Sequence, residues 1–197
     1  MLHVLPPAVT GRKLRLFALA CCERIETTLA HPLSRRAMLL VGRHAEGLAT
    51  AADVRALSHQ LMAEFNARRA GNRYDAGDAD IAAAYYMTLK VFPALAATSA
   101  LAVVPDRSEE RLSQTRLVHC VFGNPFRPFS VDPAWLTSTV VALAEGIYAE
   151  WAFDRMPILA DALQDAGCEN ADVLNHCRGD GPHVRGCWLV DLLTGRA

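Results

Sequence analysis

Five potential metal ligands lie within twenty residues near the C-terminal end: Cys168, His176, Cys177, His183 and Cys187. Thiolate and imidazole are the ligands that Zn²⁺ prefers, and four of them in a tetrahedron could bind it and hold short helices together. The spacing supports this only weakly, because there is no C-x2-C pair and two of the five are adjacent. The candidate ligands of the metal hypothesis are Cys168, His176, His183 and Cys187.

Packing is the alternative that the sequence favours for the same residues. A free Cys behaves as a small hydrophobic side chain, and His often lies at helix ends or on the surface. The four-residue spacing of His183 and Cys187 predicts one shared helix face, beside the apolar residues of 188–193. On this interpretation the chain has no metal ligand and no cofactor.

A catalytic Cys–His pair is a further possibility. Cys187 could supply a thiolate and His183 a base, with Asp191 one turn further on. Three side chains on one helix face lie in a row, however, and do not converge on a substrate atom. The chain also lacks the G-x-S-x-G, P-loop, G-x-G-x-x-G and H-E-x-x-H motifs. The sequence thus predicts no catalytic residues.

Two short predicted helices, 157–166 and 170–178, are joined at Gly167 and invite a helix-turn-helix interpretation. The second helix offers Asp172, Asn175, His176 and Arg178. Residues 119–197 carry 5 basic and 10 acidic side chains, which would place a negative field against phosphates. No nucleic-acid partner is expected.

The composition is that of a globular helical chain. It has 197 residues, 52% of them hydrophobic and 21% charged, with a net charge of −1. The 33 Ala favour helix, since Ala has the lowest helix-propensity cost. Of the 20 basic residues 18 are Arg, which would suit recognition of carboxylates or phosphates, although a GC-rich coding sequence is the more ordinary cause.

Helix follows helix along the chain, with no alternating strand pattern. The expected helices cover 10–29, 34–46, a segment from a Thr50–Asp53 capping box through Phe65, 78–92, 93–104, 109–121, 137–151, 157–166, 170–178, and a last one between Pro182 and Gly195. The fold class is therefore an all-α multi-helix bundle.

An irregular Pro-rich strap, 123–137, separates two helical regions, 1–122 and 138–197, which we expect to pack as one unit. Its Phe126, Phe129 and Trp135 are too apolar for a solvated linker. We expect them to be buried against helices of both halves; an aromatic recognition surface is the alternative.

The compartment expected from the sequence is the cytoplasm. The first residues lack the basic and apolar regions of a signal peptide, and the six Cys are unevenly placed, as for free thiols. The apolar stretch 82–104 contains Lys90 and Pro93, which favours buried helices over a membrane span.

Several segments together resemble a paralogous family of helical proteins abundant in Gemmata-type planctomycetes. They are RKLRLFALACC at 12–22, FGNPFRP at 122–128, DPAWLT at 132–137, FDRMPILADAL at 153–163 and GPHVRGCW at 181–188. The resemblance covers nearly the whole chain and is loosest over 68–116. Relatives often continue beyond 137 with a further Trp and a short polar insert, where this chain has Ser138 and Thr139. The resemblance implies no activity.

The functional expectation is a non-catalytic interaction or scaffolding module with a protein partner and no membrane or nucleic acid. The alternative is a zinc-stapled helical protein that uses the C-terminal Cys/His cluster.

Overall fold

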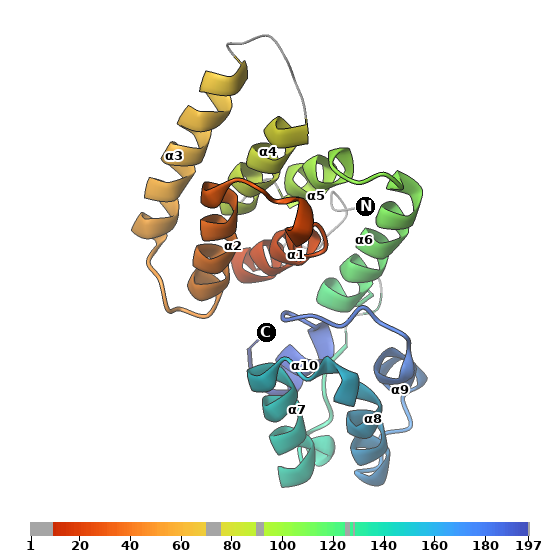
Figure 1. The fold of residues 1–197 in the computed structure, drawn as a ribbon. Helices are drawn as coiled ribbons and strands as arrows, with labels where there is room; N and C mark the ends of the chain where they lie inside the picture. The colour runs from red at the N-terminus through yellow and green to blue at the C-terminus, as the bar shows by residue number, and fades with distance from the viewer. Residues whose placement is uncertain (1–9, 70–75, 90–92, 125–126, 128, 197) are drawn as a thin grey trace. The chain divides into compact units, whose positions relative to one another are not determined.

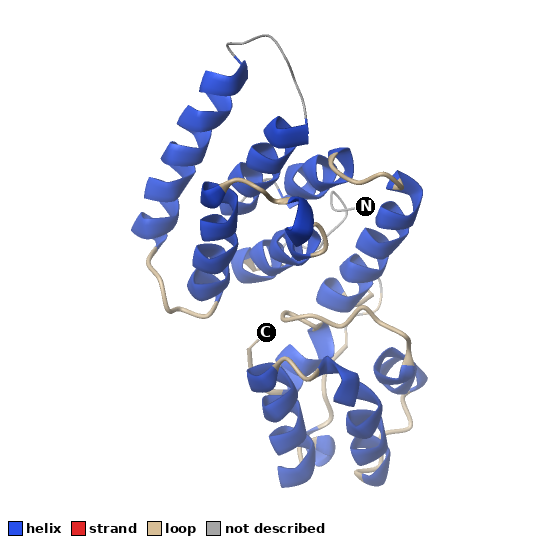
Figure 2. Cartoon of the chain, in the orientation of Figure 1, coloured by secondary structure: helices blue, strands red, loops and turns tan. Residues whose placement is uncertain are grey.

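The computed structural model describes residues 10–69, 76–89, 93–124, 127 and 129–196, and these form ten α-helices with no strand. The predicted all-α fold is confirmed (Figures 1 and 2). The chain divides into two compact units, and the boundary between them falls inside one helix. The first unit extends to Thr115 and the second continues from Arg116. The strap therefore belongs with the C-terminal unit.

The helices of the N-terminal unit follow one another through short connections. They are α1 (Gly11–Glu23), the 3-10 helix η2 (Glu26–Thr28), α2 (Pro32–Ala45), α3 (Ala51–Arg69), α4 (Ala76–Thr88), α5 (Pro93–Ala102) and α6 (Arg107–Phe122), whose second half lies in the other unit.

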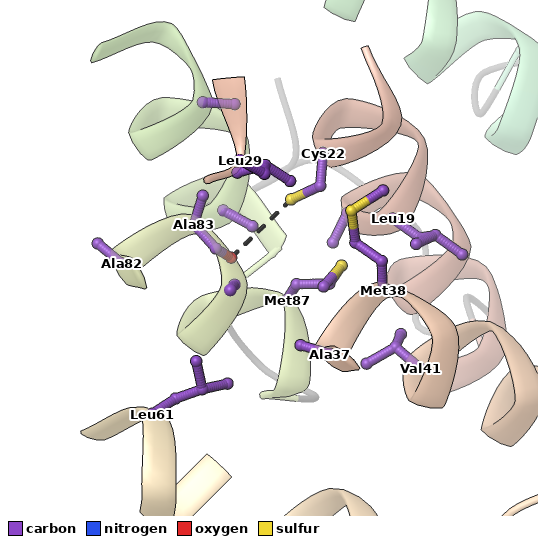
Figure 3. Close-up of a cluster of buried hydrophobic side chains, with 14 of the residues drawn as sticks. Leu19, Cys22, Leu29, Ala37, Met38, Val41, Leu61, Ala82, Ala83 and Met87 are labelled. Carbon is purple, nitrogen blue, oxygen red and sulfur yellow. Dashed lines mark hydrogen bonds between the residues drawn. The ribbon is translucent and has the colours of Figure 1, made fainter. Parts of the chain in front are cut away.

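Helix α4 is the centre of the N-terminal unit, because it packs against α1, α2, α3 and α5. Its Ala82, Ala83 and Ala84 are buried, and such small side chains let neighbouring helices approach closely (Figure 3). The thiol of Cys22 on α1 donates to the carbonyl of Ala83 across 4.0 Å. Burial raises the pKa of Cys22 to about 12, so this group packs as a neutral thiol.

Side-chain caps begin several of these helices, and the one at α3 is the predicted Thr50–Asp53 capping box. Thr10 accepts from the Lys13 N–H, and Thr50 and Asp53 form the reciprocal capping box at α3. The helix predicted over 34–46 begins two residues earlier, so Ser34 is not its cap. Helix α2 begins at Pro32, with His31 Nδ1 accepting from the Leu33 N–H, because Pro is suited to the first helical position.

The C-terminal unit surrounds a second buried core. Its elements are the end of α6, the 3-10 helices η3 (Pro133–Trp135) and η4 (Phe153–Arg155), and helices α7 (Ser138–Glu150), α8 (Met156–Asp165), α9 (Ala171–Arg178) and α10 (Trp188–Leu193). Helix α8 packs against α7 and α9, and α10 packs against α7. The core is lined by apolar side chains together with four of the six free cysteines.

The strap contributes to this second core. Phe129 and Trp135 are half-buried, not largely buried as predicted, and pack against the C-terminal cluster. The Phe129 ring meets Trp188 edge-on at 5.3 Å and stacks on Trp135 at 6.1 Å. The predicted burial of Phe126 concerns a residue outside the described ones.

The last helix is shorter than predicted. It begins at Trp188, and residues 179–187 form a loop in which Gly181 and Gly186 have φ angles of +76° and +86°. These left-handed conformations interrupt a right-handed helix and favour glycine. The predicted helix face shared by His183 and Cys187 is therefore wrong, since His183 lies in the loop and Cys187 precedes the helix.

Among the residues with assigned positions, no helix is both long and apolar enough to cross a membrane. The apolar stretch singled out in the sequence is divided between α4, which ends at Thr88, and α5, which starts at Pro93.

Candidate metal centre

Four metal-ligand side chains converge in the C-terminal unit: Cys120, His176, His183 and Cys187. Cys120 lies near the end of α6, His176 on α9, His183 in the following loop and Cys187 at the N-cap of α10. One ligand atom from each lies within 4.8 Å of all the others. The ligands thus come from two parts of the chain, the end of α6 and residues 176–187, and meet at one point.

The two histidines contact this point in different ways. His176 Nε2 lies 3.1 Å from Cys187 Sγ, and its ring meets the His183 ring edge-on at 4.9 Å. His183 Nε2 lies 3.4 Å from the Gly179 carbonyl oxygen, while its Nδ1 is buried without a hydrogen bond of normal geometry. A buried nitrogen without a partner is costly, and coordination to a metal would satisfy it.

The thiol of Cys187 is placed to ionise. Its side chain is fully buried, which by itself raises the pKa, but hydrogen-bonding interactions with Cys120, His176 and His183 outweigh burial. The pKa of Cys187 is therefore well below its usual value, and thiolate is the form that binds metal. The nearby Cys177 differs, since burial, with the proximity of Cys187 and Cys168, raises its pKa to about 12.

The donor set fits zinc. Two sulfur and two nitrogen ligands at about 2.3 and 2.0–2.1 Å from a tetrahedral Zn²⁺ lie about 3.3–3.8 Å from one another. The four atoms, all within 4.8 Å, need to contract by only about 1 Å to reach this geometry. Four protein ligands fill the coordination sphere and leave no open position for a substrate, which is typical of structural sites.

Local packing holds the ligands in place. Asn170 caps α9 by accepting from the N–H groups of Asp172 and Val173, which fixes the helix that carries His176. Trp188 lies against His176, with ring centres 5.3 Å apart, and against the backbone of Gly123 just after α6. This contact connects the end of the helix that carries Cys120 to the start of α10.

Replacement of Gly123 by Ala is expected to destabilise the C-terminal unit by about 1–3 kcal/mol. Gly123 has a φ of +65°, and a Cβ atom there would lie 3.2 Å from the Trp188 ring. Gly195 is the matched control, because it has a φ of +68° and open space around the added atom. Urea denaturation followed by Trp fluorescence should show a larger loss for Gly123→Ala than for Gly195→Ala; equal losses would refute the contact.

Three of the metal ligands predicted from the sequence also belong to the group that converges in the structure: His176, His183 and Cys187. Cys168, the fourth predicted candidate, is buried in the same hydrophobic core but lies outside the described ligand group. Cys120 takes its place and was missed by sequence reasoning, because it lies 56 positions before His176. Its only sequence signal is a lone Cys close to the end of a predicted helix.

The polar side chains that a DNA-binding helix-turn-helix would need on α9 form contacts within the C-terminal unit instead. Arg178, the cation that could have faced phosphates, donates to Asp161 and Gln164 on α8 at 2.9 and 2.8 Å. His176 on the same helix faces the cysteine cluster.

Comparison of the chain with protein-family models, with curated proteins and with solved structures gives no match.

Proposed function

We propose that this chain is a non-catalytic, zinc-stapled helical protein in which Cys120, His176, His183 and Cys187 hold one Zn²⁺. The observation that supports the proposal is the convergence of these four ligand atoms within 4.8 Å, one from Cys120 on α6 and three from residues 176–187. The donor chemistry matches structural zinc sites.

The metal would act on the fold and not on a substrate. The two cysteines are buried, Cys120 being 2% and Cys187 0% exposed, so molecules in solution cannot reach the sulfur ligands. The ion would fasten α6, α9 and the start of α10 to one another, and the exposed helix surfaces would carry the interactions of the protein. A reducing compartment, such as the cytoplasm expected from the sequence, keeps both thiols available to the metal.

Metal analysis of purified variants tests the assignment of ligands. The wild-type protein is expected to contain one zinc per chain, and Cys120→Ala is expected to lose it. Cys168→Ala is the matched control, because Cys168 is equally buried in the same core but lies outside the ligand group. This variant should retain full zinc content with only a packing loss of about 1 kcal/mol.

Cobalt substitution gives a second readout that does not depend on stability. Co²⁺ in a tetrahedral site with two thiolates absorbs strongly in the visible range, and this absorption should be present in Cys168→Ala and weakened in Cys120→Ala. A wild-type protein that binds neither ion, or a Cys120→Ala variant with wild-type zinc content, would refute the proposal.

A further inference from the structure

A cavity of about 610 Å³ lies in the N-terminal unit, between the beginnings of α1 and α3 and the end of α4. Its charged lining consists of three arginines: Arg12 and Arg15 from α1 and Arg55 from α3. Val54 and Leu89 supply apolar wall. No carboxylate is present among the described residues that line it.

The three arginines are not equally neutralised. Arg12 lies 3.7 Å from the carboxylate of Glu46. Arg15 and Arg55 have no ion pair with any carboxylate in the described part of the chain. The Nε of Arg15 is also buried without a hydrogen-bond partner. The cavity therefore carries an excess of positive charge and an unsatisfied donor.

The half-buried Arg15 is the part of this arrangement that is unfavourable without a ligand, since Arg55 is exposed to solvent. Removing a guanidinium from water costs free energy unless an acceptor or an opposite charge replaces the water. Burial lowers the pKa of Arg15, which reflects the same desolvation. An anion in the cavity would compensate both the charge and the missing hydrogen bond.

Two helix N-termini add to the positive potential. Gly11 and Ala51 are the first residues of α1 and α3, and both line the cavity. The N-terminal end of a helix carries a partial positive charge and attracts anions. Asp53 opposes this at α3, where it is hydrogen-bonded to Thr50 in the capping box.

We propose that this cavity binds the phosphate monoester group of a small organic molecule, with Arg15 and Arg55 on the phosphate and Val54 and Leu89 against its organic part. Guanidinium groups match phosphate oxygens in geometry, and a phosphate monoester carries about −1.5 to −2 charge at neutral pH. Two arginines without carboxylate partners favour such a dianion over a single carboxylate. The apolar wall beside them suits an organic substituent better than free phosphate.

Calorimetric titration of the zinc-loaded full chain with phenyl phosphate tests the site, with benzoate as the monoanion and phenol as the neutral comparator. Phenyl phosphate should bind, benzoate should bind at least about tenfold more weakly and phenol should not bind. Arg15→Gln and Arg55→Gln should each weaken phenyl phosphate by about tenfold or more. Arg111→Gln removes an exposed charge of the same unit away from the cavity and should bind as wild type does.

Two further arms complete the test. Arg15→Lys keeps the charge but loses the planar fork, so it should fold and still bind more weakly than wild type even if Arg15→Gln fails to fold. Binding to phosphatidylcholine vesicles with and without phosphatidic acid tests whether the phosphate monoester belongs to a lipid. Failure of phenyl phosphate to bind, equal affinity in all arginine variants, or binding to phosphatidic acid vesicles alone would overturn the proposal.

Discussion

With zinc held by the four ligands as proposed, a zinc chelator is expected to unfold the C-terminal unit and to leave the helices of the N-terminal unit in place. Structural zinc contributes about 10–16 kcal/mol of apparent binding free energy at neutral pH, which is as large as the whole stability of a typical domain. The second core holds Cys120 and Cys187 together with buried apolar side chains of α7 to α10, all of them in the C-terminal unit. Helices α9 and α10 have only eight and six residues, and without the ion only packing would hold them in place.

The tryptophans make this result measurable. All three, Trp135, Trp151 and Trp188, lie in the C-terminal unit, so their fluorescence reports on that unit alone. On addition of a zinc chelator their emission should shift to longer wavelength, since Trp188 packs beside His176. Far-UV circular dichroism should lose only part of its helical signal, because α1 to α5 do not contain a ligand.

Added Zn²⁺ should restore the emission and Mg²⁺ should not, because the latter prefers oxygen ligands. The variant Cys120→Ala should resemble the chelated wild type from the start. If chelator leaves both emission and helicity unchanged, the four residues are only core filling, as the packing interpretation of the sequence held.

The helices themselves were largely predictable because their signals are local. The Thr50–Asp53 box and the break at Pro93 depend on residues a few positions apart, and the structure has both. Errors occurred where two local signals competed. At α2, Pro32 at the first position together with the His31 side chain begins the helix before Ser34.

The candidate metal centre was predictable only in part, because its geometry is not local. Sequence proximity suggested Cys168, His176, His183 and Cys187 as candidates, and three of these four do converge. The position of Cys120 depends on how α6 packs in the second core, which no spacing rule contains. The helical face assumed for His183 and Cys187 failed because glycines 181 and 186 adopt left-handed conformations.

Replacement of Leu61 by Ala is expected to lower the free energy of unfolding of the N-terminal unit by about 2–5 kcal/mol. Leu61 is fully buried on α3 and points toward the Ala-rich face of α4 (Figure 3). The buried neighbours of Leu61 are close-packed and can relax only partly into the space that a deleted isobutyl group leaves. The cavity therefore remains, and the loss should lie toward the upper part of that range.

Leu39→Ala on α2 is the matched control, because the same atoms are removed from a side chain that is 73% exposed. It should cost no more than about 0.5 kcal/mol. Since all three tryptophans lie in the other unit, urea unfolding is best followed by far-UV circular dichroism, with Trp emission showing that the C-terminal unit is intact. Equal losses for the two variants would mean that α3 does not pack on α4 through Leu61, and the central position of α4 in this unit would have to be abandoned.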